Sequence, residues 1–386
     1  PGGVLIFSAH QAQPGDTISL GEGDYWESVV SIRDGEADAY ITIESADPDK
    51  RAVLRGPKDV DNDKKIFELQ HSYYRLNQFK IDGMHSSENY VDKCLYVQQN
   101  RENEDHASEI TFNDYTFRSS INGLVISNME ITNCGGECVR LRYFVTWSQI
   151  YNNVISNCGT HDFVMRGGSK NGEGIYVGTS SNQWDDGKNP SNEPDESAFN
   201  HIFDNTFNTQ GNEGVDIKEG SKYNLIEHNY CTGQKDPESA CLDARGDSNV
   251  FRYNICKDNV GAGIRIGGHN PDGHQYGQGN EMYKNILENN DYAAIKVTTG
   301  PQGAVCENQI SGSSEDSKGS KLAEELTPRA SCSTSAVDGD LQDDVSRSLD
   351  QDCSVCDMVK LLRRKLKKFK KKCKASRAAA DMLDSD

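Results

Sequence analysis

The phrase Asn200-His201-Ile202-Phe203-Asp204-Asn205 decides the fold, because the chain repeats it with an apolar residue between two turn asparagines. The copies are Asn224-Leu225-Ile226-Glu227-His228-Asn229, Asn249-Val250-Phe251-Arg252-Tyr253-Asn254 and Asn280-Glu281-Met282-Tyr283-Lys284-Asn285, with a related stretch at Gln149-Ile150-Tyr151-Asn152-Asn153 and a degraded one at Asn308-Gln309-Ile310. A unit that returns about every 25 to 30 residues indicates a solenoid, in which each coil buries its apolar side chains against the next coil.

A second short strand with strict alternation lies between these copies. It reads Gly174-Ile175-Tyr176-Val177-Gly178, Gly214-Val215-Asp216-Ile217-Lys218, Cys241-Leu242-Asp243-Ala244-Arg245, Gly263-Ile264-Arg265-Ile266-Gly267 and Ala294-Ile295-Lys296-Val297-Thr298. Short alternating strands bounded by Asn and Gly are typical of a parallel β-solenoid, and no helical period competes with them. The sequence therefore predicts an all-β fold, a right-handed parallel β-helix.

The chain is predicted to contain three segments. Residues 1–311 form the β-helix, and residues 312–357, rich in Ser, Asp, Glu and Gly, are expected to be a disordered linker. Residues 358–386 are expected to form a basic helical tail, because Val359, Leu362, Leu366 and Phe369 recur at helical spacing among many Lys and Arg. This tail either contacts an anionic surface or acidic partner, or folds onto the acidic solenoid.

Composition limits the partners and the compartment. Asp and Glu number 60 against 41 Lys and Arg, a formal charge of −19, and such an acidic surface disfavours nucleic acid. An anionic substrate then needs a local basic groove or a bound cation. Twelve cysteines suit an oxidising compartment, and the start at Pro1 suggests that a targeting segment has been removed, so we expect a secreted, extracellular protein. No apolar run is long enough to span a membrane.

The cysteines form no convincing metal site. Cys134 and Cys158 fall at equivalent points of successive coils, as do Cys231 and Cys256. Adjacent strands lie about 4.8 Å apart, which permits a disulfide. We favour buried free cysteines, because strand neighbours in register rarely have suitable torsion angles for a disulfide. The Cys353–Cys356 pair is expected to be a disulfide or a thiol pair rather than a zinc site.

Stacking the alternating strands builds columns of side chains that point away from the core. One column contains Tyr176, Asp216, Asp243, Arg265 and Lys296, and the next contains Gly178, Lys218, Arg245, Gly267 and Thr298. Arg140 and Arg142 extend the patch by one coil. The alternatives are a solvated charge ladder with modest pairing energy, or a binding site.

Three long insertions bracket these strands and are expected to wall a groove. They are residues 160–172, with Arg166; residues 179–198, with Trp184; and residues 269–279, with His269, His274 and Tyr276. The expected substrate-binding residues are therefore Arg265, Lys296, Tyr176, Arg166, Trp184, His269 and His274. Trp184 and Tyr276 either stack on sugar rings or simply pack.

The stretch Glu213-Gly214-Val215-Asp216-Ile217-Lys218-Glu219-Gly220-Ser221-Lys222-Tyr223-Asn224, followed one coil later by Leu242-Asp243-Ala244-Arg245-Gly246, resembles the pectate-lyase-like superfamily. The resemblance is closest to the alginate lyase and chondroitinase B family of polysaccharide lyases. In that family an acidic strand, a Lys and an Arg on the next coil carry the site, which implies catalytic roles for Lys218 and Arg245. The family's lysine lies just before a Ser, so Lys222 is an alternative to Lys218.

β-Elimination from a uronate requires a cation to neutralise the carboxylate, a base near the C5 proton and an acid near the leaving oxygen. Arg245 and Arg265 are expected to lower the pKa of Lys218 and make it the base. Asp216, Asp243 and Glu213 offer hard oxygen ligands, so calcium is the expected cofactor.

Function therefore has one leading reading and two alternatives. The leading reading is a secreted lyase that cleaves a uronate-containing, acidic glycan. The first alternative is a non-catalytic extracellular protein that binds glycan or builds matrix, which the tail favours as an attachment device. The second is a β-helix glycoside hydrolase that uses Asp216 and Asp243 as its paired carboxylates.

Overall fold

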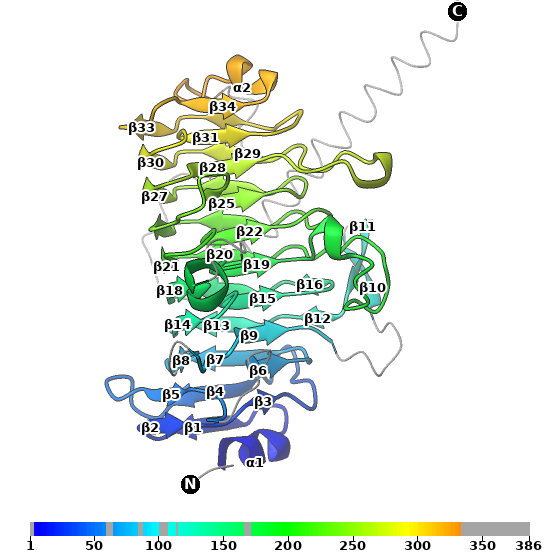
Figure 1. Ribbon diagram of the computed structural model, residues 1–386. Coiled ribbons are helices and arrows are strands. Elements are labelled where there is room, and N and C mark those ends of the chain that lie inside the picture. Colours follow the sequence, from blue (N-terminus) through cyan, green and yellow to red (C-terminus); the bar gives the residue numbers. More distant parts are fainter. Residues whose placement is uncertain are drawn as a thin grey trace, which may run out of the picture. The chain divides into compact units, whose positions relative to one another are not determined.

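A computed structural model describes residues 4–58, 65–83, 88–99, 107–112, 115–165 and 171–332. The chain divides into a solenoid unit, Pro1–Ile110 and Phe117–Ser331, and a second unit, Thr111–Thr116 and Cys332–Asp386. The solenoid unit is a right-handed parallel β-helix, which confirms the predicted fold (Figure 1). The predicted basic tail and most of the predicted linker lie outside the described residues.

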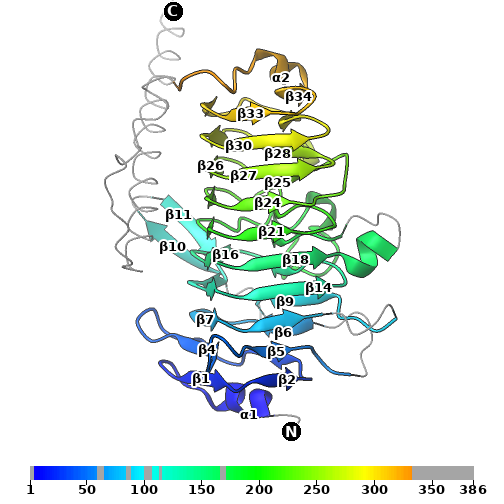
Figure 2. The same cartoon turned by 90° about the vertical axis from the view of Figure 1, so that its left-hand side faces the viewer.

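Three parallel sheets of ten strands each form the walls of the solenoid, and every coil adds one strand to each sheet. Sheet A contains β1 (Thr17–Leu20), β4 (Ile41–Ser45), β7 (Tyr74–Asn77), β13 (Val125–Ser127), β17 (Gln149–Tyr151), β20 (His201–Phe203), β23 (Leu225–Glu227), β26 (Val250–Arg252), β29 (Glu281–Tyr283) and β32 (Val305–Cys306). Sheet B, which faces the viewer in Figure 2, contains β2 (Gly23–Tyr25), β5 (Ala52–Leu54), β8 (Lys80–Asp82), β14 (Glu130–Cys134), β18 (Val154–Cys158), β21 (Thr206–Asn208), β24 (Tyr230–Thr232), β27 (Ile255–Asn259), β30 (Ile286–Asn290) and β33 (Gln309–Ser311). Sheet C contains β3 (Val29–Val30), β6 (Lys65–Leu69), β9 (Lys93–Val97), β15 (Val139–Leu141), β19 (Ile175–Val177), β22 (Val215–Ile217), β25 (Ala240–Ala244), β28 (Ala262–Ile266), β31 (Ile295–Val297) and β34 (Ser317–Gly319).

The remaining elements are short. Two further two-stranded sheets pair β10 (Ser108–Phe112) with β11 (Tyr115–Ser119) and β12 (Ile121–Asn122) with β16 (Val145–Thr146). The helices are α1 (Val4–Gln11), α2 (Lys321–Glu325), the π-helix η1 (Thr160–Met165) and the 3₁₀ turns η2 (Ser181–Gln183) and η3 (Pro271–Gly273). None of the helices in the described part of the chain has the length and apolarity that a membrane crossing requires.

The repeated asparagines hold the coils in register. Their side-chain amides donate to the next asparagine's Oδ1 at 2.9–3.3 Å along two main ladders, Asn153–Asn205–Asn229–Asn254–Asn285–Asn308 and Asn200–Asn224–Asn249–Asn280. These side chains also satisfy buried backbone carbonyls inside the turns, as Asn254 does for Ile226. The ladders explain why the phrase returns with its asparagines fixed while its other residues vary.

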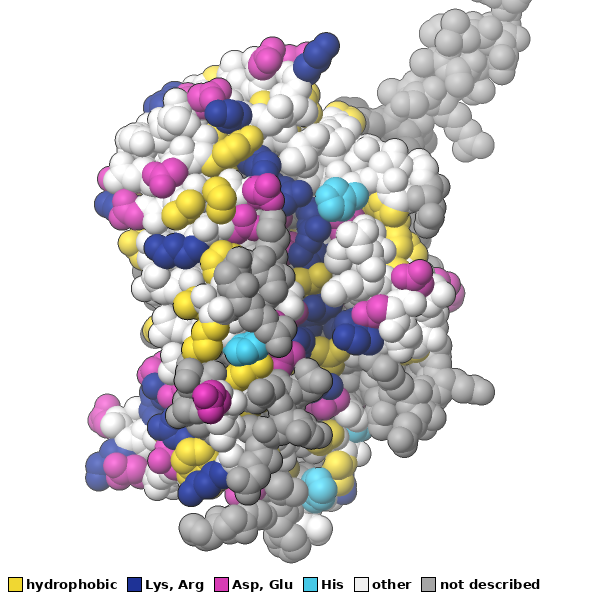
Figure 3. All heavy atoms as spheres, viewed as in Figure 1, with side chains coloured by type: hydrophobic (Ala, Val, Ile, Leu, Met, Phe, Trp, Pro, Cys, Tyr) yellow, Lys and Arg dark blue, Asp and Glu magenta, His cyan; other side chains and the backbone are white. Residues whose placement is uncertain are grey.

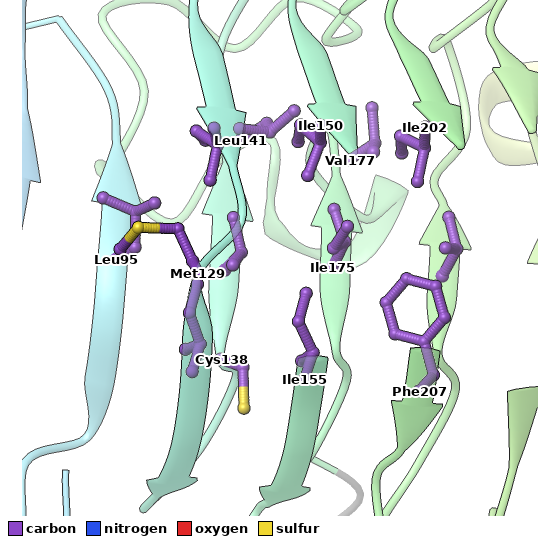
Figure 4. Close-up of a cluster of buried hydrophobic side chains, with 14 of the residues drawn as sticks. Leu95, Met129, Cys138, Leu141, Ile150, Ile155, Ile175, Val177, Ile202 and Phe207 are labelled. Atoms are coloured by element: carbon purple, nitrogen blue, oxygen red, sulfur yellow. The ribbon is translucent and has the colours of Figure 1, made fainter. Parts of the chain in front are cut away.

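The interior between the sheets is filled by the apolar residue of each alternating strand (Figure 4). Ile155, Ile175, Val177, Ile202 and Phe207 are all buried and point into the same space from the three walls. Each coil therefore stacks aliphatic side chains on those of the coils above and below, which is the main stabilising contribution in a solenoid.

The preference for free cysteines was wrong for three of the four in-register residues. Cys134 and Cys158 are register partners, as are Cys231 and Cys256, but neither pair is bonded. Three of the disulfides are Cys94–Cys134, Cys138–Cys158 and Cys231–Cys241, with Cα separations of 5.7, 5.5 and 6.0 Å. Each disulfide joins sheet B to the region of sheet C across the interior rather than along the stack. Cys256 is buried and free, as predicted.

The solenoid ends later than the sequence analysis expected. Strand β34 pairs with β31, and α2 packs its buried Ala323 into the core, so residues 312–325 belong to the last coil and its cap. The predicted linker therefore began too early at residue 312, because a short polar strand closing a solenoid has the composition of a loop. At the other end, α1 covers the first coil with Leu5 and Ala9.

Candidate functional site

The structure confirms both predicted columns on the outer side of sheet C. Register pairs join Arg140 to Tyr176, Tyr176 to Asp216, Asp216 to Asp243, Asp243 to Arg265 and Arg265 to Lys296. Backbone hydrogen bonds place Arg142, Gly178, Lys218, Arg245, Gly267 and Thr298 in the neighbouring column. We call these two columns the charged face. Figure 3 shows Lys and Arg side chains following one another along a hollow over sheet C, with a His side chain beside them.

A layer of buried carboxylates underlies this face. Oxygens of Glu173, Glu213 and Asp216 all lie within 4.8 Å of one another, and the three residues form what we call the carboxylate cluster. Glu213 Oε2 and Asp216 Oδ1 are buried and have no hydrogen-bond partner among the described residues. Unpaired buried carboxylate oxygens are costly, so this cluster has an affinity for protons or a cation.

Burial and mutual repulsion raise the pKa values of two acids in this layer. Burial raises the pKa of Glu173 to about 8, since Glu137, Glu213 and Asp216 oppose the lowering effect of Lys218. Burial and the charge of Asp216 likewise raise the pKa of Glu213 to about 7. Such pKa values are typical of functional sites, although structural clusters also produce them.

Lys218 is buried against this layer. Its Nζ bonds the carboxylate of Asp216 and lies 4.1 Å from the ring centroid of Tyr176. Burial alone lowers the pKa of Lys218, but Asp216, Tyr176 and the nearby glutamates outweigh burial and raise it well above its usual value. The expectation that neighbouring arginines lower this pKa was wrong, because the acids lie closer to Nζ than the sequence could show.

Lys222 occupies a different environment. Its Nζ pairs with Glu196 Oε1 at 2.8 Å, and both side chains are partly exposed. Among the described residues, Lys218 is therefore the lysine that contacts the carboxylate cluster. This geometry makes Lys218, rather than Lys222, the counterpart expected for a site lysine.

Tyr176 lies between two cations. Arg140 Cζ is 3.7 Å from its ring centroid on one side, and Lys218 approaches from the other. Burial raises the pKa of Tyr176 to about 12 despite these cations, so the phenol carries its proton at neutral pH. Arg140 is in turn fixed by an ion pair with Glu137 at 2.7 Å.

The basic residues become more accessible toward the C-terminal coils. Arg245 pairs with Asp216 at 3.4 Å and with Glu219 at 3.6 Å, and Arg265 pairs with Asp243 at 3.3 Å. The side chains of Arg245, Arg265 and Lys296 all remain partly open. Asp243 is thus held by Arg265 and lies outside the carboxylate cluster, whereas two other predicted metal ligands, Glu213 and Asp216, lie within it.

The loop of residues 179–198 covers one side of the face. Trp184 is buried and donates from Nε1 to the Thr179 carbonyl, with its ring 5.7 Å from that of Tyr276. Trp184 therefore packs inside the loop and offers no open platform for a sugar. Gln183 Oε1 accepts from Arg140 at 3.2 Å, which places the loop over the column.

The loop of residues 269–279 brings a histidine to the site. His269 Nδ1 lies 3.2 Å from Glu219 Oε1, the same oxygen that contacts Arg245. The His269 side chain is 49 % exposed, whereas Glu219 is buried. His274 is exposed and stands beside Tyr276, with the ring centroids 4.3 Å apart. Arg166 lies outside the described residues.

Sequence reasoning missed Glu173, Glu137 and Glu219. The sequence does contain a signal for the first two. On three successive coils a glutamate lies two residues before the first residue of the sheet C strand: Glu137 before Val139, Glu173 before Ile175 and Glu213 before Val215. Glu219 was quoted within the motif, but its role depends on a loop that crosses from two coils away, which no local pattern reports.

Comparisons with known proteins agree with this architecture. Residues 167–323 match the family model described as right handed beta helix region. An alginate lyase from Paenibacillus sp. str. FPU-7 superposes with a TM-score of 0.61 at 21 % identity, covering 79 % of this chain and 92 % of that one. Pectate lyase Pel9A gives 0.46 at 11 % (84 % and 75 % covered), and a mannuronic acid specific polysaccharide family 6 lyase from human gut microbiota gives 0.41 at 17 % (84 % and 80 %). No curated protein matches the chain. The predicted fold is therefore confirmed, and this chain is a right-handed parallel β-helix protein.

Proposed function

We propose that this protein is an extracellular polysaccharide lyase that cleaves a uronate-containing glycan by β-elimination on the charged face. The observation that carries the proposal is the convergence of Lys218, Tyr176 and Arg245 beside open basic residues, on a molecule whose formal charge is −19. On so acidic a surface, a continuous row of basic side chains creates a local positive potential that favours an anionic ligand. The solved alginate lyase that this fold resembles supports the same substrate class.

The substrate carboxylate would be neutralised by Arg245 and Arg265. Removing the C5 proton of a uronate places negative charge on that carboxylate, so fixed cations stabilise the transition state more than the ground state. Both guanidiniums are already oriented by buried acids, Asp216 and Asp243, which reduces the cost of ordering them on binding. In this proposal the catalytic role of Arg245 is charge stabilisation rather than lowering of the pKa of Lys218.

Two positions would share the proton transfers: the buried pair of Lys218 and Tyr176, and the exposed His269. Lys218 and Tyr176 both carry protons at neutral pH, so they suit donation to the leaving glycosidic oxygen. His269 is the open imidazole beside Arg245, and its contact with buried Glu219 fixes the ring orientation. We assign His269 the role of general base toward C5, in place of the base role first expected of Lys218.

Calcium is proposed at the carboxylate cluster. The donor set fits, because three carboxylates offer hard oxygen ligands and two of their oxygens are unpaired. Glu173, Glu213 and Asp216 would hold the ion. When bound, it would supply positive charge beneath the site.

The glycosidase alternative has weaker support. Asp216 and Asp243 are register neighbours, but both are buried and ion-paired to basic side chains, so neither is placed to attack a sugar. Extracellular location is supported by the three disulfides, which persist in oxidising compartments. Non-catalytic glycan binding remains the outcome to be separated by experiment.

The test is incubation with alginate, pectate and chondroitin, with and without calcium, while following the ultraviolet absorbance of unsaturated uronates. A lyase produces that absorbance on at least one polymer. Tight binding to a uronate polymer without any absorbance would contradict the lyase proposal and support the non-catalytic alternative.

A further inference from the structure

Burial along the charged face changes abruptly from one end to the other. Its central column continues through Tyr96, Arg140 and Tyr176 on the N-terminal side and through Arg265, Lys296 and Lys318 on the C-terminal side. Arg140 and Tyr176 are only 3 % and 4 % exposed. The side chains of Arg265 and Lys318 are 14 % and 44 % exposed. The same column is therefore closed at one end and open at the other.

Gln183 accounts for the closed end. Its Oε1 accepts from Arg140 at 3.2 Å and lies 3.5 Å from the Tyr176 hydroxyl, so this side chain sits directly on the column. The 3₁₀ turn η2 carries Gln183, and Ser181 in that turn donates its backbone N–H to buried Glu219 at 3.2 Å. The closure is thus made where the proposed proton donor Tyr176 stands.

The loop of residues 179–198, which carries Gln183, is anchored to the solenoid by side-chain hydrogen bonds. Arg142 donates to Asn189 at 2.7 Å and to Asp186 at 2.9 Å, and is itself buried. Asp195 accepts the backbone N–H groups of Tyr143 and Phe144 at 2.6 and 2.9 Å. Charge-assisted bonds from a buried arginine and a buried aspartate make this loop a fixed wall rather than a flexible lid.

We propose that the protein acts on chain ends: one terminus of a uronate polymer rests against Gln183, and the rest of the chain leaves over Arg265, Lys296 and Lys318. This inference rests on the proposed lyase function. A groove that is open at both ends accepts any internal bond, whereas a groove walled beside the reacting groups admits only the few sugars between wall and scissile bond. Successive coils lie about 4.8 Å apart, so the three basic side chains form an evenly spaced track for the carboxylates of successive sugars.

Product size over time tests the proposal. With the polymer that gives uronate absorbance, exolytic action should release short products of constant size from the start, while solution viscosity falls slowly relative to absorbance. A ladder of long intermediates with an early collapse of viscosity would overturn the proposal while leaving the lyase function intact. Absence of absorbance on every uronate polymer would instead refute the function on which it rests.

Variants of the wall and the track give a second test. Gln183→Ala removes the side chain on the column but keeps the anchors at Asp186 and Asp195, so the loop should stay folded and longer products should appear. Lys318→Ala should raise KM for the polymer by up to about fivefold and leave KM for the shortest cleaved oligosaccharide unchanged. Unchanged product sizes in Gln183→Ala, together with an equal effect of Lys318→Ala on short and long substrates, would contradict the closed-end arrangement.

Discussion

Lys218 holds its ammonium nitrogen 4.1 Å from the ring centroid of Tyr176, a residue of the preceding coil. The contact joins two proton-bearing groups in one buried position, with Asp216 beneath the ammonium and Arg140 beyond the ring. Neither group would have this environment on a single isolated strand. The pairing is a product of the stacking of successive coils.

Lys218→Met should reduce the rate of uronate release by about 10²- to 10⁴-fold, since it removes the proposed proton donor. The matched control is Lys222→Met, four residues along, whose partly exposed pair with Glu196 predicts a change of no more than about twofold. Steady-state rates on the active polymer provide the measurement. Because Lys218→Met leaves the buried carboxylate of Asp216 with the longer Arg245 contact as its remaining ion pair, the double variant with Asp216→Asn checks that lost activity is not lost folding. Equal effects at Lys218 and Lys222 would contradict the assignment.

His269→Gln should lower kcat by about 10²-fold, because it removes the proposed general base. Glu219→Gln should reduce the rate less, since it loosens the ring without removing it. His274→Gln is the control, as this exposed histidine belongs to the same loop and contacts Tyr276 instead. An unchanged kcat in His269→Gln would assign the base to another residue.

The carboxylate cluster should make stability depend on pH. The pKa values of Glu173 and Glu213 are raised from 4.5 to about 8 and about 7, so the folded state binds more protons than the unfolded state between these limits. Without divalent cations, the free energy of unfolding should therefore fall as pH rises from about 4.5 to about 8. Glu173→Gln should flatten this decline and raise Tm at pH 9. Calorimetric scans in EDTA test this, and a steeper decline in the variant would refute it.

Calcium should relieve the same excess of negative charge. At pH 8, adding calcium is expected to raise Tm and to release protons on binding, because the ion replaces protons on Glu173 and Glu213. Glu213→Gln should weaken both effects. Glu130→Gln is a suitable control, since Glu130 pairs with Lys80 on another sheet. Equal calcium responses in the two variants would place the ion elsewhere.

Buried Glu227 predicts that the folded state loses stability at acidic pH. Burial raises the pKa of Glu227, but the hydrogen bond from His201 and the charge of Arg252 outweigh burial and hold it at about 2. A depressed carboxyl pKa stabilises the fold above pH 4.5, and this contribution, about 3 kcal/mol, is lost as pH falls from about 4.5 toward 2. Glu227→Gln should therefore destabilise the protein at pH 7 and much less at pH 2.5. Urea unfolding at the two pH values decides the matter.

Much of the architecture could be predicted because a solenoid turns sequence period into spatial register. The copies of the second, alternating strand were enough to place Asp216 beside Asp243 and Arg265 beside Lys296, and the structure confirms both register pairs. Period-two alternation also identified which side chains leave the core. Stacking requires only local repetition, so local reasoning suffices for it.

The environment of the site could not be predicted in the same way. The pKa of Lys218 depends on its burial and on the charges of Asp216, Tyr176 and Glu173, the last two of which belong to the preceding coil. The disulfide from Cys94 to Cys134 crosses between sheets, so repeat spacing within one sheet gave the wrong state for Cys134. Burial of Trp184 depends on contacts that its own loop makes after folding. These properties arise from irregular loops and from contacts between sheets, which carry no period.

The ladder of asparagines has a consequence for how such a molecule can change. Because each coil is held to the next by the same amide contacts, one coil can be exchanged or duplicated without disturbing its neighbours' geometry. The reacting groups occupy the coils of Tyr176, Lys218 and Arg245 and the loop that carries His269, while Lys296 and Lys318 lie on later coils. Selectivity for a glycan can therefore evolve through substitutions on the later coils, without changes to the groups that carry out the reaction.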